Sequence, residues 1–301
     1  VLADYAAFLN RLVPLTGRHL SVVVDAGNGM GGHTVPAVLE GRPLTITPLF
    51  FELDGTFPNH EANPIEPENL RDLQARVVAE GADLGLAFDG DADRCFVVDE
   101  RGEAVSPSTL TALIATRELA GTPGATIIHN LITSRAVPEI VTEHGGVPVR
   151  TRVGHSFIKA TMAETDAVFG GEHSGHFYFR DFWRADSGML AALHVLAAAA
   201  ETTRPPSQLF ADFERYVLSG EVNSSVSDVA AVLARLESSY GAREDVVVDH
   251  LDGLSVTHAD WGFNVRPSNT EPLLRLNAEG RDADTMAAVR DEVLELIRSD
   301  P

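Results

Sequence analysis

The chain has 301 residues, of which 44% are hydrophobic and 22% charged, a composition typical of a folded protein with two or three domains. It carries 44 Asp and Glu against 23 Lys and Arg, a formal net charge of −21. This balance argues against nucleic acid and anionic membranes as partners, because neutralising phosphate groups takes a basic surface.

The cysteine content and hydropathy indicate the compartment. Cys95 is the only cysteine, so no disulfide can form within the chain, and we expect a reducing, cytoplasmic location. No run of residues approaches the ~20 apolar residues that a membrane span needs. The sequence opens at Val1 directly in a helix-like pattern, so we expect that a segment upstream is missing.

The first third of the chain alternates between helical and extended patterns. The pattern predicts a helix over residues 1–12, strands at 21–25 and 44–51, and a helix over 68–80. The first strand is followed by Gly27, Gly29 and Gly32 in the G-x-G-x-x-G spacing, with Glu52 about twenty residues further on. This spacing is the fingerprint of a dinucleotide-binding turn, so a nicotinamide-dependent oxidoreductase is one hypothesis.

The most informative stretch is Asp89-Gly90-Asp91-Ala92-Asp93-Arg94, which lies between two short apolar runs that read as strands. Side chains at alternate positions of an extended loop project to one side, so Asp89, Asp91 and Asp93 can converge. Three adjacent carboxylates require compensation, and a hard divalent cation such as Mg²⁺ supplies it. Arg94 adds a positive charge suited to gripping a phosphate. The alternative is a solvated acidic loop.

The remainder of the chain predicts two further units. Helices over 107–120, 134–143, 156–164 and 186–200 alternate with strands at 125–129, 147–153 and 167–169. The last 85 residues or so combine two helices with strands that follow one another directly. We therefore predict two α/β domains with mixed or mainly parallel sheets, followed by a small α+β domain with an antiparallel sheet, with boundaries at 1–103, 104–212 and 213–301.

Three more loops carry candidate chemistry. Gly170 to His176 places Glu172, Ser174 and His176 at alternate positions, a pattern suited to holding the hydroxyls of a sugar. At residues 153–156, the amides of Gly154 and His155 can meet an anion at a helix N-terminus, or Ser156 can be the helix N-cap. His155 is a candidate for proton transfer or for binding a phosphate.

The third loop runs from Val265 to Pro272 and has the composition of a phosphate clamp. It combines an arginine, two hydroxyls and an amide with exposed backbone N–H groups, namely Arg266, Ser268, Asn269 and Thr270. Pro267 and Pro272 stiffen the turn. A plain hairpin turn is the alternative.

In this order, these loops resemble those of the α-D-phosphohexomutase superfamily, particularly its bacterial phosphomannomutase/phosphoglucomutase branch. The matching segments are 89–94, 171–176 and 266–272, supported by 24–31, 57–60 and 153–159. The resemblance implies a phosphomannomutase that interconverts mannose 6-phosphate and mannose 1-phosphate through a bisphosphorylated hexose. Phosphoglucomutase or dual specificity is the alternative within this family.

The resemblance also implies roles for the residues of these loops. Asp89, Asp91 and Asp93 would hold Mg²⁺, and Arg94 would steady a phosphoserine. Glu172 and Ser174 would grip sugar hydroxyls, while His155 and His176 line the cleft. The clamp residues Arg266, Ser268, Asn269 and Thr270 would hold the phosphate that is not transferred.

The chain departs from the family in one important respect. The family's nucleophilic serine lies in a T-x-S-H-N-P loop, and no such string occurs in these 301 residues. We therefore expect the N-terminal phosphoserine domain of the same protein to be an absent partner, and expect the chain alone to bind metal poorly and to be inactive. Ile132 stands where some relatives carry a basic residue. A non-catalytic module that binds sugar phosphates remains a further alternative.

Overall fold

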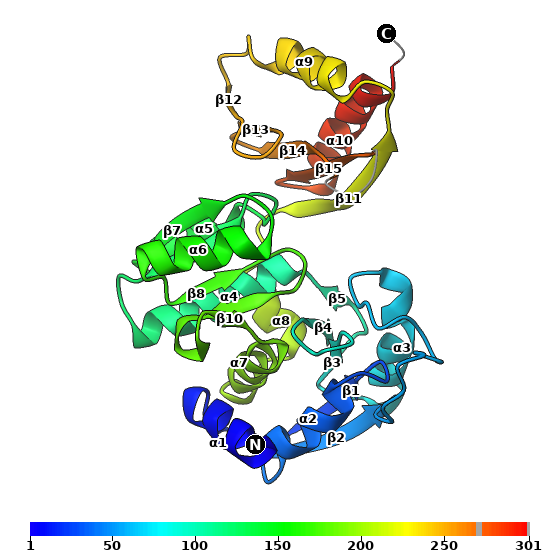
Figure 1. Cartoon of the computed structure of the whole chain (residues 1–301), viewed down its shortest axis with the longest axis vertical. Coiled ribbons are helices and arrows are strands. Elements are labelled where there is room, and N and C mark those ends of the chain that lie inside the picture. The colour runs from blue at the N-terminus through cyan, green and yellow to red at the C-terminus, as the bar shows by residue number, and fades with distance from the viewer. Residues whose placement is uncertain (269–272, 300–301) are drawn as a thin grey trace.

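The computed structural model describes residues 1–268 and 273–299, which form three successive units, each built on a five-stranded sheet (Figure 1). The first two units are mixed α/β and the third is α+β with an antiparallel sheet, which confirms the predicted fold class. No helix in the described ranges is both long and apolar enough to cross a membrane. The predicted domain boundaries remain predictions.

The first unit positions the acidic loop. Its elements are α1 (Leu2–Leu12), β1 (Leu20–Asp25), α2 (Gly31–Leu39), β2 (Leu44–Leu49), the 3-10 helix η1 (Pro67–Leu70), α3 (Arg71–Glu80), β3 (Leu84–Phe88), β4 (Cys95–Asp99) and β5 (Ala104–Val105). The strand order is β2-β1-β3-β4-β5, with β1 parallel to both of its neighbours and β3 antiparallel to β4. Every residue of β3 and β4 is buried, so the loop between them is anchored at both ends.

The second unit repeats this plan. It contains α4 (Pro107–Gly121), β6 (Thr126–Asn130), α5 (Ala136–Glu143), β7 (Val147–Thr151), α6 (His155–Thr165), β8 (Phe169–Gly171), β9 (Phe177–Phe179), the 3-10 helix η2 (Arg180–Phe182), β10 (Ala185–Asp186), α7 (Gly188–Ala200) and α8 (Pro206–Ala211). The strand order is β10-β9-β8-β6-β7. The carboxyl ends of β7 and β8, which are both parallel to β6, lead into the candidate loops at residues 153–156 and 172–176.

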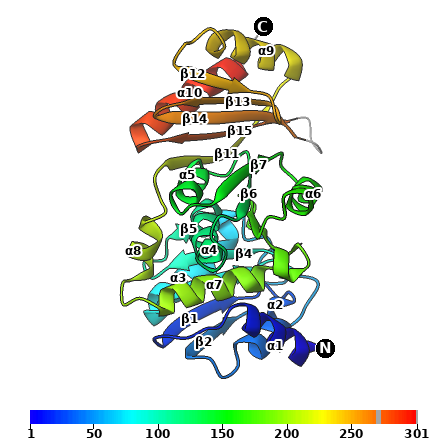
Figure 2. The same ribbon diagram turned by 90° about the vertical axis from the view of Figure 1, so that its left-hand side faces the viewer.

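Helix α7 joins the first two units. All of its residues are buried, because it is built of alanine, leucine and other apolar side chains on every face. It packs against α4 and also against β1 and β4, so one apolar core runs through both units. Figure 2 shows α7 lying between the two sheets.

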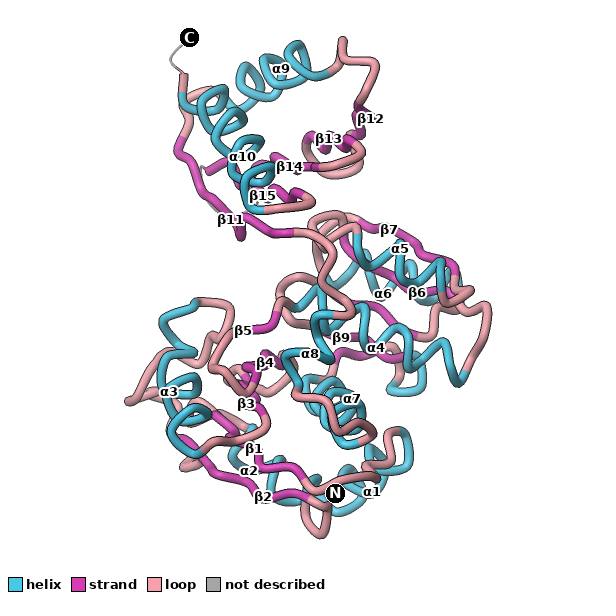
Figure 3. Tube along the Cα trace, turned by 180° about the vertical axis from the view of Figure 1, so that it is seen from behind, coloured by secondary structure: helices cyan, strands magenta, loops and turns pink. Residues whose placement is uncertain are grey.

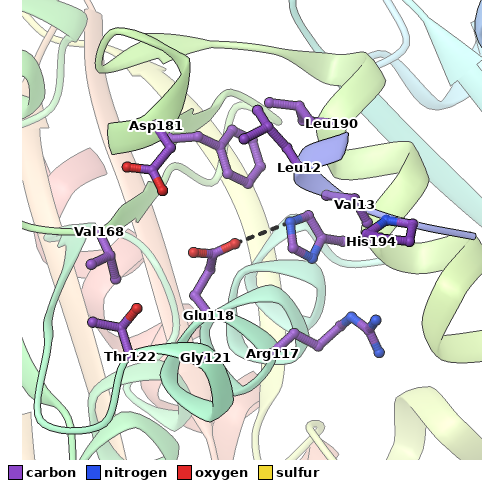
Figure 4. A pocket seen from close by; sticks show the side chains of 12 residues that line it. Leu12, Val13, Arg117, Glu118, Gly121, Thr122, Val168, Asp181, Leu190 and His194 are labelled. Carbon is purple, nitrogen blue, oxygen red and sulfur yellow. Dashed lines mark ion pairs between the residues drawn. The ribbon is translucent and has the colours of Figure 1, made fainter. Parts of the chain in front are cut away.

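A cavity of about 310 Å³ lies where α7 meets α4 and the end of α1 (Figure 4). His194 of α7 stacks on Phe179 with 5.4 Å between ring centroids, and its Nε2 lies 3.1 Å from a carboxylate oxygen of Glu118 on α4. This ion pair adds a polar contact to the apolar packing of the two helices.

The third unit consists of β11 (Val217–Ser225), α9 (Val229–Tyr240), β12 (Val246–Asp249), β13 (Leu254–His258), β14 (Trp261–Pro267), β15 (Leu273–Gly280) and α10 (Ala283–Arg298). Its strands, seen also in Figure 3, follow the order β11-β15-β14-β13-β12 and are antiparallel throughout. Helices α9 and α10 cover one face over a separate apolar core, and the other face turns toward the second unit (Figures 1 and 2).

The start of α7 touches the backbone of the acidic loop. A Cβ atom at Gly188 would lie 2.4 Å from the carbonyl oxygen of Arg94 and 3.0 Å from that of Ala92. Real Cβ atoms do not approach backbone oxygen this closely, so only glycine allows the contact. The loop is thus held in part by a helix of the second unit.

We predict that Gly188→Ala destabilises the chain by about 1–3 kcal/mol, because either the helix or the acidic loop must move to accept the methyl group. Urea unfolding followed by circular dichroism measures the change. The matched control is Gly121→Ala at the end of α4, where an added Cβ meets nothing within 4 Å. An equal change in the free energy of unfolding in the two variants would contradict the proposed role of this contact.

Candidate active site

The three aspartates of the acidic loop converge as the sequence predicted. Asp89, Asp91 and Asp93 each place a carboxylate oxygen within 4.8 Å of the other two. Asp89 is buried, Asp91 is exposed and Asp93 is intermediate, so the cluster opens to solvent on one side. An open cluster of carboxylate oxygens is the donor set that Mg²⁺ prefers, and the residues present therefore fit that ion.

Arg94 supplies the balancing positive charge. Its Nε donates to Asp89 Oδ2 at 2.7 Å, its backbone N–H donates to Asp89 Oδ1 at 3.1 Å, and its Nη1 donates to Asn63 at 3.0 Å. Burial raises the pKa of Asp89, against the lowering effect of these hydrogen bonds. The pKa of Asp93 is lowered chiefly by its hydrogen bond with His176, so this cluster member favours the charged form.

The acidic loop is joined directly to the loop at residues 172–176. Arg94 and His176 form an isolated backbone bridge, and the N–H of Cys95 donates to the carbonyl oxygen of Gly175 at 3.2 Å. The side chains meet as well, because His176 Nε2 lies 3.5 Å from Asp93 Oδ1. Two candidate loops from different sheets therefore form one surface.

Glu172 is the most enclosed carboxylate of this surface. One of its oxygens accepts from Asn130 and from the N–H of Gly154, both at 3.3 Å, and the other accepts from the Tyr178 hydroxyl at 2.8 Å. A carboxylate has about four acceptor positions, so one position remains for an external hydroxyl donor. Ser174 lies beside it, with its hydroxyl 2.9 Å from His176 Nδ1.

His155 stands at the entrance to this surface. Its ring lies 4.2 Å from that of His176 between centroids, and its Nδ1 lies 2.7 Å from the Tyr178 hydroxyl and 3.3 Å from Asp186 Oδ2. The Nζ of Lys159 lies 3.1 Å from the other oxygen of Asp186. The Asp186 carboxylate is thus placed to stabilise a positive charge on His155.

The helix start at this point differs from one prediction. The N-cap of α6 is Gly154 and the helix begins at His155, so Ser156 lies inside the helix and is not its cap. The anion at the predicted helix terminus belongs to the protein itself, because the Gly154 N–H donates to Glu172. At Gly154 the terminus therefore orients a carboxylate.

Arg266 of the third candidate loop faces Arg275 of the following strand across β14 and β15. Arg266 and Arg275 are directly paired in the strand register, and Glu221 of β11 lies 3.3 Å from the first and 3.1 Å from the second. Burial lowers the pKa of Arg266, whose Nε has no hydrogen-bond partner in the described ranges. Two like charges held together in this way favour an anion.

Ser268 lies next to this pair and accepts from Arg275 at 3.1 Å. The predicted clamp residues Asn269 and Thr270 lie outside the described residues. A cleft of about 1070 Å³ lies between the second and third units and extends to the first. Ser174, Arg266, Ser268 and Arg275 line it together with His173. Burial and then the two arginines lower the pKa of His173 to about 3, so this histidine stays neutral at physiological pH.

The glycine motif of the first unit has a packing role. A Cβ at Gly29 would lie 2.5 Å from the Gly90 carbonyl oxygen, which itself accepts from the N–H of Met30 at 2.9 Å. The turn after β1 therefore approaches the backbone of the acidic loop. This close contact explains why residue 29 is a glycine, whereas the sequence alone suggested that Gly29 belongs to a dinucleotide-binding turn.

Four functional neighbours were missed by sequence reasoning: Asn130, Tyr178, Asp186 and Arg275. Tyr178 and Asp186 lie on β9 and β10, and Asn130 ends β6. Their only sequence signal is position, since each is a polar residue at or near the end of an apolar strand. Arg275 alternates with buried leucines along β15, and this period-2 pattern places it on the face opposite the core.

Comparisons with known proteins agree with this geometry. Three family models match in succession: phosphoglucomutase/phosphomannomutase alpha/beta/alpha domain II at residues 3–102, alpha/beta/alpha domain III at 106–216, and the C-terminal domain at 221–296. The solved structure of a phosphoglucomutase/phosphomannomutase family protein from Burkholderia thailandensis superposes with a TM-score of 0.87 at 33% identity. That alignment covers 99% of this chain and 65% of the other.

Curated relatives give the same result. The phosphomannomutase of Salmonella montevideo is 41% identical over 298 residues, covering 97% of this chain and 64% of the Salmonella protein. A protein named phosphohexose mutases from Xanthomonas campestris pv. campestris is 40% identical over 302 residues, covering 98% and 67%. The chain thus spans about two thirds of the length of these relatives. Matched along nearly its whole length, the chain belongs to the phosphoglucomutase/phosphomannomutase family of the α-D-phosphohexomutase superfamily.

Proposed function

We propose that this chain provides the metal, sugar and phosphate sites of a phosphomannomutase that interconverts mannose 6-phosphate and mannose 1-phosphate. The observation that carries the proposal is the continuity of the three loops, since Asp93 touches His176 and the loop of His176 shares a cleft with Arg266. Phosphoryl transfer depends on positioning and charge neutralisation, which such an arrangement supplies.

In this proposal, Asp89, Asp91 and Asp93 hold Mg²⁺, which when bound neutralises charge on the phosphoryl group. Arg94, tied to Asp89, presents its remaining N–H groups to the phosphate of a phosphoserine. We place that serine outside these 301 residues, because the T-x-S-H-N-P loop does not occur in them.

Substrate recognition is divided between the sugar and its distal phosphate. Glu172 keeps one acceptor position for a sugar hydroxyl, and Ser174 supplies a second polar contact at the cleft. Arg266, Ser268 and Arg275 hold the phosphate that is not transferred, with Asn269 and Thr270 as the remaining proposed ligands. The bisphosphorylated hexose is the intermediate, and it must reverse its orientation between the two transfers.

We assign proton transfer to His155. When a sugar hydroxyl attacks the phosphoryl group it loses its proton, and an imidazole beside a carboxylate is suited to receive it. Asp186 stabilises the imidazolium that results, as its distance of 3.3 Å to Nδ1 allows. The serine oxygen that leaves takes up a proton from solvent. In the second transfer the serine hydroxyl loses its proton to solvent as it attacks, and the imidazolium returns its proton to the sugar oxygen that leaves.

A second candidate is a mutase with a broader range of hexose phosphates. The Xanthomonas relative is named for hexoses rather than mannose at nearly the same identity as the Salmonella protein, which supports this candidate. Glucose and mannose differ at one hydroxyl. Turnover of glucose 1-phosphate beside mannose 1-phosphate therefore separates the two candidates.

We predict that mannose 1-phosphate binds weakly to this chain and that Arg266→Ala lowers its affinity by about tenfold or more, because the variant removes a charge-assisted contact to the phosphate. Titration calorimetry measures both. The matched control, Arg290→Ala on α10, removes an arginine that is paired with Asp291 and lies away from the cleft, and this variant should bind normally. Equal affinities of the parent chain and both variants for mannose 1-phosphate would refute the proposed phosphate clamp.

In a full-length protein that carries the phosphoserine, Asp91→Asn should lower kcat at least about a hundredfold, because a neutral amide balances the cation less well than a carboxylate. Chelation of Mg²⁺ should abolish turnover in the parent protein. The control is Asp284→Asn in the first turn of α10, an exposed position far from the cluster. Near-normal turnover of the Asp91 variant would overturn the metal assignment.

A further inference from the structure

A second group of ligating side chains lies beside the aspartate cluster. His155, Glu172 and His176 each offer one ligand atom within 4.8 Å of the other two. The set contains two imidazoles and one carboxylate, donors that suit Zn²⁺ and similar borderline divalent ions better than Mg²⁺. We propose that these three residues, the His–Glu–His site, bind Zn²⁺ independently of the aspartate cluster.

The geometry needs little adjustment to accept the ion. Zinc–nitrogen and zinc–oxygen bonds of about 2.0–2.2 Å place ligand atoms of a tetrahedral site roughly 3.3 Å apart. His176 Nδ1 already lies 3.6 Å from Glu172 Oε2. The His155 ring meets the His176 ring edge to face at 4.2 Å between centroids, so movement of His155, which is half exposed, can complete the site.

Each histidine also has a carboxylate behind it. Asp186 Oδ2 lies 3.3 Å from Nδ1 of His155, and Asp93 Oδ1 lies 3.5 Å from Nε2 of His176. When each carboxylate accepts a hydrogen bond from the N–H of the nearer nitrogen, the other nitrogen of that ring has a free lone pair. This carboxylate–histidine arrangement is the one that orients zinc ligands in proteins.

The surrounding charge and hydrogen bonds also favour a cation. Glu172, Asp186 and Asp93 face the site with three negative charges, and the Lys159 ammonium, paired with Asp186 at 3.1 Å, contributes one positive charge. The Tyr178 hydroxyl keeps Glu172 in place with its bond at 2.8 Å. The ion replaces the hydrogen bond between Ser174 and Nδ1 of His176. The Tyr178 hydroxyl contacts Nδ1 of His155, which is not the nitrogen that would bind the ion.

Zinc and substrate would then compete. Glu172 is the residue assigned above to a sugar hydroxyl, so a zinc ion on its free acceptor position blocks that contact. This consequence rests on the proposed function, whereas zinc binding itself does not. The two ions use different donors, so excess Mg²⁺ should leave zinc binding in place.

The test titrates Zn²⁺ into this chain by calorimetry in the presence of excess Mg²⁺, with Co²⁺ absorption as a readout of coordination by nitrogen ligands. We expect one tight site in the parent chain. His155→Gln and His176→Gln should each weaken it by about tenfold or more, as loss of even an outer-shell partner does. Circular dichroism checks that each variant is folded. If His176→Gln is unstable, the result for His155→Gln decides the test, because His155 is the more exposed of the two residues.

Two controls locate the ion. Asp91→Asn alters the aspartate cluster but none of the proposed zinc ligands, and His250→Gln removes a histidine that is 57% exposed and paired with Glu237. Both should bind zinc like the parent chain. Loss of binding in Asp91→Asn with retention in His155→Gln would place the ion at the aspartates and overturn the proposal. No tight site in the parent, or equal weakening in His250→Gln, would overturn it as well.

A competition experiment separates this inference from the proposed function. Mannose 1-phosphate should lower the apparent zinc affinity, and inorganic phosphate at the same concentration controls for chelation of free zinc. Competition by the sugar phosphate supports both conclusions. Zinc binding that the histidine variants abolish but the sugar phosphate leaves unchanged would support the His–Glu–His site and contradict Glu172 as the sugar contact.

Discussion

The backbone bridge between Arg94 and His176 is the contact on which the site depends. It joins a loop of the first sheet to a loop of the second, and the Cys95–Gly175 hydrogen bond continues it. Isolated loops that carry three aspartates and a buried glutamate would repel each other. Here Arg94 balances Asp89, and His176 lies between Asp93 and Glu172. The apolar core that runs through both units, with α7 at its centre, provides the rigidity that keeps these charges together.

The third unit contributes a pair of arginines to the cleft. Its antiparallel sheet alternates between leucines that face α10 and polar residues that face the cleft, so Arg275 comes to lie opposite Arg266. Glu221 forms ion pairs with both arginines. The chain carries a net charge of −21, and a compact positive surface is therefore needed wherever an anionic substrate is to bind. The arginine pair at the cleft is such a surface.

Much of the fold and part of the site were predictable from sequence. The acidic loop could be located because buried runs on both sides leave only a short turn, and alternation makes Asp89, Asp91 and Asp93 converge. Glu172, Ser174 and His176 follow the same logic. Asn130, Tyr178 and Asp186 could not be found, since their importance arises only when strands distant in sequence become neighbours in the second sheet. Gly29 was misleading, because its spacing imitates a nucleotide motif while its contact is with the backbone at Gly90.

The apolar cores have a consequence for how such proteins can be recombined. The first two units share one core through α7, so a crossover between homologues placed between them would pair side chains that never evolved together. The third unit has a core of its own. It meets the second unit through polar contacts such as those of Glu279 with Ser134 and the Arg135 N–H. Exchanging residues 217–299 between relatives would therefore change the proposed phosphate ligands while the loops of the aspartates and of Glu172 stay unchanged, which offers a route to new substrate ranges.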